Sequence, residues 1–305
     1  MCGYSQKEVK TVIKTSESGL LSKDYYILVM IEYKEIIIKQ EEINLHKIAE
    51  SGQCFRWKQI GEQDFFVIAG GKAACFTQKE KGISIFCRPE DEKYFRNYLD
   101  LEMDYGKIED EICQEDTYLC CAAQEGRGIR ILRQDLWETI ISFIISQRNN
   151  IPRIKNTIDA ICEALGEKIV IQFAGKEWIG YTFPGPEKLA EADLTPFKLG
   201  YRQTYLEKAA KDVIEGKINL EELKRMEEKQ AHDTLCRIKG VGIKVASCIQ
   251  LFGLHQLSVF PVDTWIKKVE EQHYGGHFPV EKYEGYAGII QQFFFFYARG
   301  AYHNE

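Results

Sequence analysis

Short apolar runs separated by tight turns dominate the first third of the chain. Residues 25–33, 35–39, 65–69, 73–77 and 83–88 are rich in Ile, Val, Phe and Tyr. Gly70-Gly71 and the charged segment 79–82 separate neighbouring runs, as in β-hairpins. The pattern predicts an antiparallel sheet.

The hydrophobic period changes at Pro89, where a proline followed by three acidic residues is typical of a helix start. In residues 135–148 the apolar positions 137, 140, 141, 144 and 145 fall on one face of a helix. Pro152 opens the next predicted helix, which runs to Gly166. Further helices are predicted at 205–214, 220–226, 230–236, 243–252, 264–272 and 283–297.

These patterns predict an α+β protein in which an antiparallel β domain precedes an all-helical region. We expect an N-terminal extension at 1–34, the β domain at 35–107 and the helical region at 108–305, with a helix–hairpin–helix at 230–252. A chain of 305 residues is long enough for two domains.

Composition indicates an ordinary globular protein, 45% hydrophobic and 28% charged. Ten cysteines without a Cys-x-x-Cys pair, in a chain with no apolar leader, favour a reduced cytoplasmic protein over a secreted disulfide framework. No apolar run is long enough to span a bilayer. The His and Cys residues show no ligand spacing, so we expect no metal and no other cofactor.

The net charge of −6 argues against a nucleic-acid partner, because phosphate binding usually leaves a basic footprint. The charge is segregated, however. Residues 90–116 hold eleven acids and three bases, a net charge of −8. Residues 127–155 and 229–268 each hold six bases and two acids, a net charge of +4. These two basic segments are the candidates for a phosphate-facing surface.

The strongest local signal is Gly240-Val-Gly242 between two predicted helices. Glycines allow the backbone to approach a ligand, and the free N–H groups that begin a helix bind anions. The pattern fits a hairpin that grips a DNA phosphate with main-chain donors. A plain packing corner between two helices explains the glycines equally well.

Lys244 and Asp263 are the candidate catalytic pair. Lys244 lies close to the positive end of the second helix, which disfavours its charged form and favours a nucleophilic amine. Taken alone, it is better explained as a solvated lysine or a phosphate contact. Asp263 precedes a predicted helix, so it is expected to be the N-cap, and a capping carboxylate can also stabilise a sugar cation.

Several ordered motifs resemble the 8-oxoguanine DNA glycosylase/lyase family, within the helix–hairpin–helix superfamily of base-excision enzymes. The similarity covers about residues 35–300. The matching motifs are 51–57 (SGQCFRW), 132–135 (LRQD), 146–153 (SQRNNIPR), 199–202 (LGYR), 240–244 (GVGIK), 261–263 (PVD) and 286–288 (YAG), followed by Gln291. The resemblance implies a TBP-like β domain before the helical glycosylase region.

The resemblance implies that Lys244 attacks the anomeric carbon of the sugar with help from Asp263, expels the base, forms a Schiff base and cleaves the strand by β-elimination. It also implies that Gly52 accepts a hydrogen bond from 8-oxoguanine, that Cys248 and Phe295 sandwich the flipped base and that Gln291 binds its Watson–Crick edge. Without the family, Gly52 fits a turn, Cys248 and Phe295 fit the core, and Gln291 with Gln292 fits a solvated pair.

The remaining implied contacts are with DNA. Residues of three motifs match positions that fill the hole left by the flipped base, contact the orphaned base or hold a phosphate: Arg148, Asn149, Arg153, Tyr201, Arg202, Lys239, Gly240 and Gly242. Taken singly, the first five fit a helix-ending turn and ordinary surface residues.

Three positions depart from the family pattern. Lys239 replaces the usual proline of the hairpin, Arg148 replaces an asparagine and Trp265 replaces a histidine. The change at Arg148 leaves the preferred base opposite the lesion open. No cysteine follows Cys248, which disfavours the iron–sulfur relatives.

The sequence therefore predicts a monomeric, cytoplasmic 8-oxoguanine glycosylase/lyase whose partner is double-stranded DNA and which needs no membrane. Two alternatives stay open. The same scaffold can serve another damaged base, because pocket shape sets the base that is accepted. A non-catalytic module can use the hairpin only to bind DNA.

Overall fold

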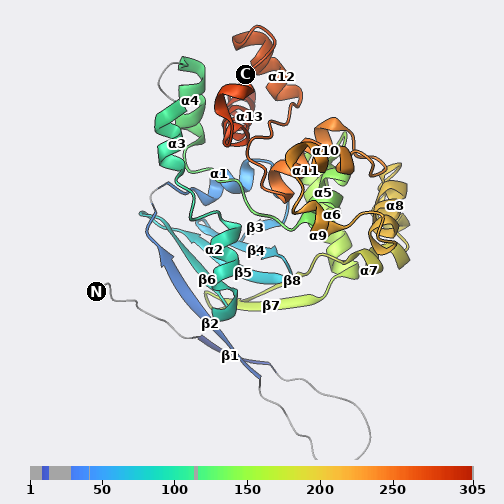
Figure 1. The fold of residues 1–305 in the computed structure, drawn as a ribbon. Coiled ribbons are helices and arrows are strands. Elements are labelled where there is room, and N and C mark those ends of the chain that lie inside the picture. The colour runs from blue at the N-terminus through green and yellow to red at the C-terminus, as the bar shows by residue number, and fades with distance from the viewer. Residues whose placement is uncertain (1–8, 14–28, 41, 113–115, 304–305) are drawn as a thin grey trace, which may run out of the picture.

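The computed structural model describes residues 9–13, 29–40, 42–112 and 116–303. Six antiparallel strands form one sheet in the order β1-β2-β6-β5-β4-β3 (Figure 1). The strands are β1 (Val9–Ile13), β2 (Val29–Ile38), β3 (Trp57–Gln59), β4 (Asp64–Ala69), β5 (Lys72–Gln78) and β6 (Ile83–Cys87). The predicted antiparallel sheet is confirmed. The runs at 35–39 and 25–33 share one strand, β2, although residues 25–28 lie outside the described residues.

Both faces of the sheet are buried at its central strands β4, β5 and β6, which explains why these strands are almost continuously apolar. In β4, Phe65 and Val67 point to one face, against helices α1 (Leu45–Glu50) and α2 (Glu92–Tyr98). Phe66 and Ile68 point to the other face, because successive strand residues alternate sides.

A β-hairpin covers this second face and corrects the prediction of an all-helical second region. Strands β7 (Lys168–Phe173) and β8 (Lys176–Tyr181) are joined by Ala174 and Gly175, whose φ angles of 52° and 75° fit a type I′ turn. The Tyr33 hydroxyl donates to the carbonyl of Val170 at 3.1 Å, and Ile171 is buried beside Phe66. The sequence of the hairpin has no helical period, and its Ala174-Gly175 turn is typical of a β-hairpin, but neither feature entered the prediction of an all-helical region.

Helices make up the rest of the described chain, and the α+β class is confirmed. The remaining helices of four residues or more, the short 3₁₀ turns aside, are α3 (Tyr105–Ile112), α4 (Thr117–Gly126), α5 (Leu136–Ser146), α6 (Ile151–Leu165), α7 (Pro186–Glu191), α8 (Arg202–Ile214), α9 (Leu220–Leu223), α10 (Glu228–Leu235), α11 (Ile243–Gly253), α12 (Thr264–His273) and α13 (Ala287–His303). Within the described residues, no helix combines the length and the apolarity needed to cross a membrane.

Helix α5 lies at the centre of the helical core. Every residue from Leu136 to Ile145 is buried except Glu138. Phe143 of α5 stacks on Phe252 of α11, with ring centroids 5.5 Å apart. This contact joins the last turn of α11 to α5, and Lys244 from the first turn of α11 also lies close to the Phe143 ring. The candidate site lies there.

A buried ionic network joins the end of α2 to the loop that precedes α5. Asp100 accepts hydrogen bonds from Arg133 Nε at 2.8 Å and the Tyr105 hydroxyl at 3.0 Å, and its Oδ2 lies 3.2 Å from His255 Nε2. Burial raises the pKa of Asp100, but the hydrogen bond and charge of His255 and the charge of Arg133 outweigh burial and lower it. These contacts cross residue 107, the predicted limit between the β domain and the helical region. The domain limits stay a prediction.

Candidate active site

A cavity of about 250 Å³ lies among the end of α5, the starts of α6, α11 and α12, and one face of α13. Seven of the residues singled out in the sequence line it, although they span more than 240 positions: Gly52, Asn149, Lys244, Cys248, Asp263, Gln291 and Phe295. The fold therefore brings the predicted catalytic and base-binding residues together.

Lys244 lies in the first turn of α11, with an exposed side chain that reaches into the cavity mouth. Its Nζ lies 5.9 Å from the centre of the Phe143 ring. Gly242 occupies the N-cap and supplies no side-chain cap. The first N–H groups of α11 are therefore available for an anion beside the Lys244 amine.

Asp263 is the N-cap of α12, as predicted. Its Oδ1 accepts hydrogen bonds from the N–H groups of Trp265 and Ile266, both at 2.9 Å. Both capping bonds end on Oδ1. Oδ2 is therefore the oxygen left for chemistry in the cavity, and the cap holds the carboxylate in place.

Cys248 lies one turn after Lys244 and is buried in the cavity wall. Burial raises the pKa of its thiol, the charge and hydrogen bond of Lys244 lower it, and the charge of Asp263 raises it again, for a net increase. The thiol is therefore neutral near pH 7 and forms an apolar, polarizable surface. Lys244 and Asp263 line the same cavity as this thiol.

Gly52 packs directly against the Phe295 ring, and both residues line the cavity. Gly52 has a φ of 75°, and a Cβ added there would lie 3.1 Å from Phe295 Cε1. Phe295 is half-buried, and the guanidinium of Arg299 lies 5.6 Å from its ring centre. Phe293 and Phe294 are fully buried, so these two rings of the run are packing residues, as predicted.

Gln291 and Gln292 are both buried and both line the cavity, with 4% and 3% of their surfaces exposed. The expectation of a solvated pair is wrong, because α13 turns this face toward the protein interior. Gln292 Nε2 donates to Gln291 Oε1 at 3.2 Å. Gln292 Oε1 is buried without a hydrogen-bond partner among the described residues.

The hairpin between α10 and α11 is tied to the loop that follows α5. Gly240 has a φ of 89°, and its carbonyl accepts a hydrogen bond from Gln147 Nε2 at 2.9 Å. A Cβ at Gly240 would lie 2.2 Å from the Tyr205 ring, whereas a Cβ at Gly242 would meet nothing within 4 Å. Lys239 is exposed, with its Nζ 5.8 Å from the Tyr205 ring centre.

The loop between α5 and α6 carries Arg148 in the left-handed region, with a φ of 46°. Arg148 and Arg153 are exposed, and Asn149 is half-buried with its side-chain amide donating to the Ile145 carbonyl at 3.2 Å. Asn150 caps α6 by accepting from the Arg153 N–H at 3.0 Å. The loop and the first turn of α6 therefore present two exposed arginines near Asn149, which lines the cavity.

Tyr201 and Arg202 begin α8 but differ sharply in exposure. The Tyr201 ring is 45% exposed, whereas Arg202 is only 9% exposed. The Arg202 guanidinium donates to the carbonyls of Gln147, Arg148 and Leu199, with its Nε 2.9 Å from the Gln147 oxygen. Arg202 therefore holds the Arg148 loop, a role that the sequence did not indicate, and its contact with the orphaned base stays a prediction.

The predicted basic segment at 127–155 is only partly a phosphate-facing surface. Arg130 is fully buried and donates to the carbonyls of Asp100 and Met103. Arg127 pairs with Glu42 and Glu109, and Arg133 pairs with Asp100. Arg127 and Arg133 therefore face acids of the protein itself, and Arg130 is buried out of reach of a phosphate.

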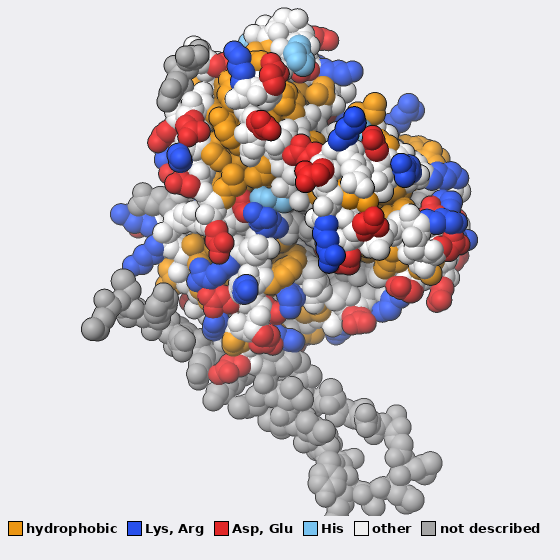
Figure 2. Space-filling model, viewed as in Figure 1, with side chains coloured by type: hydrophobic (Ala, Val, Ile, Leu, Met, Phe, Trp, Pro, Cys, Tyr) orange, Lys and Arg blue, Asp and Glu red, His pale blue; other side chains and the backbone are white. Residues whose placement is uncertain are grey.

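The acidic stretch lies away from the hairpin. Figure 1 places α3 and α4 at the left edge of the molecule, across from α8 and α10. Figure 2 shows acidic side chains in this left-hand part, and others over the centre and the right of the same face. The segregation of charge along the sequence therefore does not give one separate acidic surface on this face.

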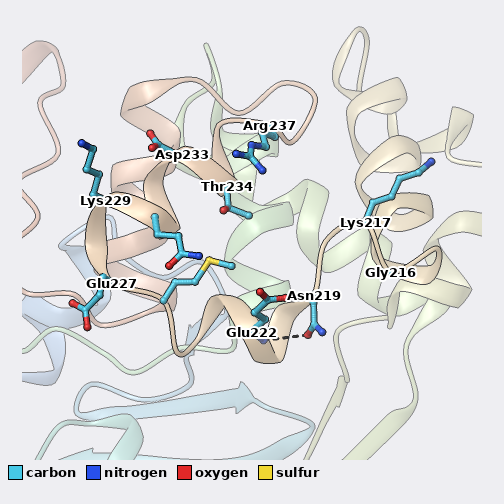
Figure 3. A pocket seen from close by; sticks show the side chains of 11 residues that line it. Gly216, Lys217, Asn219, Glu222, Glu227, Lys229, Asp233, Thr234 and Arg237 are labelled. Carbon is cyan, nitrogen blue, oxygen red and sulfur yellow. Dashed lines mark hydrogen bonds between the residues drawn. The ribbon is translucent and has the colours of Figure 1, made fainter.

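A second cavity, of about 530 Å³, lies between the loop after α8, the short helix α9 and α10 (Figure 3). Three bases and three acids line it: Lys217, Lys229, Arg237, Glu222, Glu227 and Asp233. Their charges cancel, and none of the predicted site residues is among its lining residues. Although it is larger, it lacks the convergent chemistry of the cavity around Lys244.

Several cavity residues were not predicted from the sequence: Phe55, Phe143, Trp265, Gln292 and Arg299. Trp265 stands out in the sequence only as a departure from the family pattern. Arg299 follows Phe295 by one helical turn, a spacing that could have suggested it. Burial of Gln292 carries no sequence signal, because two adjacent glutamines read as solvent-exposed.

The comparisons with known proteins agree with this geometry. The family model for the 8-oxoguanine DNA glycosylase N-terminal domain matches residues 35–140. An N-glycosylase/DNA lyase of Saccharomyces cerevisiae is 28% identical over 280 residues, covering 80% of this chain and 71% of that protein.

Two solved structures match nearly the whole chain. MBOgg1 in complex with a low-affinity DNA ligand is 32% identical, with a TM-score of 0.80 over 96% of this chain and 99% of that one. The 8-oxoguanine glycosylase/lyase of Clostridium acetobutylicum, in complex with double-stranded DNA containing cytosine opposite 8-oxoguanine, is 32% identical, with a TM-score of 0.81 over 96% and 98%. This chain belongs to the 8-oxoguanine DNA glycosylase family.

Proposed function

We propose that this protein is a bifunctional DNA repair enzyme that excises 8-oxoguanine from duplex DNA and then cleaves the strand at the abasic site. The observation that carries the proposal is the single cavity shared by Lys244, Asp263 and the residues expected to bind the base. Membership of the family supports the same activity.

The chemistry begins with the Lys244 amine, which gives up a proton and attacks the anomeric carbon C1′ of the flipped nucleotide. The C1′–N9 bond breaks, and its electron pair leaves with the base, which takes up a proton at N9. The Asp263 carboxylate, fixed by its two capping bonds, stabilises the positive charge that develops on the sugar. Opening of the sugar ring leaves a Schiff base between Lys244 and C1′.

Strand cleavage follows from the Schiff base. The iminium withdraws electrons from C2′, so a base removes a proton there and the 3′ phosphate leaves by β-elimination. Water then hydrolyses the imine and frees Lys244. Asp263, which lines the same cavity as Lys244, is the carboxylate available for these proton transfers.

The cavity walls suit a flat purine. Cys248 offers a neutral thiol, and Phe295 offers a ring whose face is bounded by Gly52. We infer that the flipped base lies between Cys248 and Phe295, with the Gly52 carbonyl accepting from its N7–H, a hydrogen that guanine lacks. Gln291 reads the Watson–Crick edge from the buried wall.

The DNA contacts divide by chemistry. Main-chain N–H groups at Gly240 and Gly242 hold a phosphate with support from Lys239, because α11 has no side-chain cap. Arg148 and Asn149, with Arg153, fill the hole and reach the orphaned base, and Tyr201 stacks as a wedge. Arg202 supports that loop from behind. We expect the protein to act as a monomer in the cytoplasm, on the chromosome.

Borohydride trapping tests the mechanism. Reduction of the Schiff base on an 8-oxoguanine duplex should give a covalent protein–DNA adduct. Lys244→Gln should abolish the adduct without changing the melting temperature, because the side chain is exposed. Lys229→Gln, at an exposed lysine of the second cavity, is the matched control and should trap as the wild type does.

Each alternative gives a different result. An adduct that survives Lys244→Gln would remove Lys244 as the nucleophile. Trapping on a duplex with another damaged base, and none with 8-oxoguanine, would assign a different lesion to the same scaffold. Tight duplex binding with no base release by the wild type would indicate a DNA-binding module without catalysis.

A further inference from the structure

Gln292 stands out as a buried polar side chain whose hydrogen bonding is incomplete. It is 3% exposed, and its carbonyl oxygen Oε1 has no partner among the described residues. Leaving a buried acceptor unsatisfied costs about 1–3 kcal/mol. Such a group in a native structure calls for an explanation, and a ligand that supplies the missing donor is one.

The position of Gln292 supports that explanation. It lines the cavity of Lys244 and Cys248, and its neighbour Gln291 lines the same cavity. Adjacent helical residues point about 100° apart, so two consecutive residues in one cavity wall approach a bound molecule from two directions. Phe295 follows Gln292 by three residues, so the free oxygen lies on the helical face that carries the expected stacking ring.

The hydrogen bond between the two amides determines which of their donors and acceptors remain available to a ligand. Gln292 Nε2 donates to Gln291 Oε1 at 3.2 Å, so one donor of Gln292 is used and its acceptor is left over. The same bond occupies part of Gln291 Oε1 and leaves the Gln291 amide nitrogen as a donor. Together the pair presents one donor and one acceptor to a bound base.

We propose that Gln292 is a further specificity-determining residue, whose Oε1 accepts a hydrogen bond from a donor on the Watson–Crick edge of the flipped base. The inference rests on the proposed function and extends base recognition from one amide to a linked pair. A guanine-type edge carries an acceptor at O6 beside donors at N1 and the 2-amino group, which matches a donor and an acceptor side by side.

The test is a cycle of two enzymes and three substrates under single-turnover conditions. The enzymes are the wild type and Gln292→Leu, which keeps the approximate volume and removes the amide. The substrates are duplexes with 8-oxoguanine, with 8-oxoinosine, which lacks the 2-amino group, and with 8-oxoadenine, whose N1 carries no hydrogen. The measured quantity is the rate constant of base release.

We expect the effect of Gln292→Leu on base release to depend on the substrate. Gln292→Leu should slow release of 8-oxoguanine about tenfold, which corresponds to about 1.4 kcal/mol, but should change release of at least one analogue by less than about twofold. Gln292→Glu keeps an acceptor oxygen at this position and should retain more of the 8-oxoguanine rate than Gln292→Leu. An equal slowing on all three substrates would show a packing effect and overturn the proposal.

A control separates lost specificity from lost stability. Gln250→Leu removes another buried glutamine, which donates to the Glu228 carbonyl and to Gln256 outside the cavity wall. It should destabilise the protein without changing the ratio of rates between substrates. If the wild type releases no 8-oxoguanine, the proposed function fails before this comparison; if it does and the ratios do not change, only the role of Gln292 fails.

Discussion

Replacing Arg202 with methionine tests whether this arginine supports the Arg148 loop or contacts DNA itself. Methionine keeps much of the buried aliphatic volume and removes the guanidinium. In the structure the guanidinium makes four hydrogen bonds to three carbonyls, those of Gln147, Arg148 and Leu199. These bonds close the loop in which Arg148 has a φ of 46°.

The magnitude follows from those bonds. Hydrogen bonds to a charged donor contribute about 1.5–3 kcal/mol each, but the Arg148 carbonyl lies in an exposed loop and can be solvated by water instead. The left-handed conformation at Arg148 costs roughly 1–2 kcal/mol and relaxes when the loop is released. We therefore expect Arg202→Met to lower the free energy of unfolding by about 2–4 kcal/mol, and Tm by about 5–10 °C.

Thermal unfolding and base release measured on the same preparations provide the assay. Arg202→Met should lower Tm and reduce discrimination among the four bases opposite the lesion, because the loop that carries Arg148 and Asn149 is no longer fixed. Arg153→Met is the matched control at an exposed arginine of α6. It should leave Tm unchanged and weaken DNA binding.

The reasoning is refuted if Arg202→Met melts within about 1 °C of the wild type while discrimination is lost. That result would mean that the four bonds to the loop add little to stability and that the guanidinium acts directly on the orphaned base, as the family resemblance implies.

Three further predictions concern the hairpin, the buried ionic network and the charge of the surface. Gly240→Ala should lower Tm, because the added Cβ would lie 2.2 Å from the Tyr205 ring at a position with a φ of 89°. The Cβ of Gly242→Ala would meet open space, so this variant should keep the wild-type Tm but bind duplex more weakly in a filter assay. The pKa of Asp100 is lower in the folded than in the unfolded protein, where it is about 3.9, so the ionised carboxylate stabilises the fold above that pH. This stabilisation is lost as the pH falls through the folded-state pKa. The denaturant midpoints of the wild type and Asp100→Asn should therefore differ at pH 7 and converge toward pH 3. The slope of log K for non-specific duplex binding against log salt should be shallow, about −3 to −4, if Arg148, Arg153, Lys239 and Lys244 are the main cations at phosphates. A slope near −8 would contradict that assignment by showing that other bases also contact phosphates.

Much of the site was predictable because the chemistry is carried by residue types at fixed local spacings. Gly240 and Gly242, Lys244, and the capping position of Asp263 follow from turn, helix-start and N-cap rules that operate over a few residues. The structure adds that these segments meet Gly52 and Gln291 in one cavity. That meeting is a tertiary fact, and family resemblance rather than local pattern anticipated it.

The features that could not be predicted from the sequence depend on contacts with segments that are distant along the chain. The strands β7 and β8 carry an ordinary hairpin pattern, yet a buried sheet face had to exist before the hairpin had a place to pack. Arg202 and Arg130 are both read as surface charges, because burial of an arginine is rare and depends on carbonyls supplied by distant segments. Gln292 belongs to the same class.

We infer that this acidic chain binds DNA mainly through short-range donors. Arg127 and Arg133 face acidic partners within the protein, and Arg130 is fully buried against backbone carbonyls. A chain with a net charge of −6 gains little from long-range attraction to phosphate, so well-placed short-range donors become more important. The uncapped start of α11 supplies such donors without adding charge, and its first turn also carries Lys244. In the proposed mechanism, the helix end that binds the DNA backbone also carries the nucleophile, so that a phosphate bound there positions the sugar for attack.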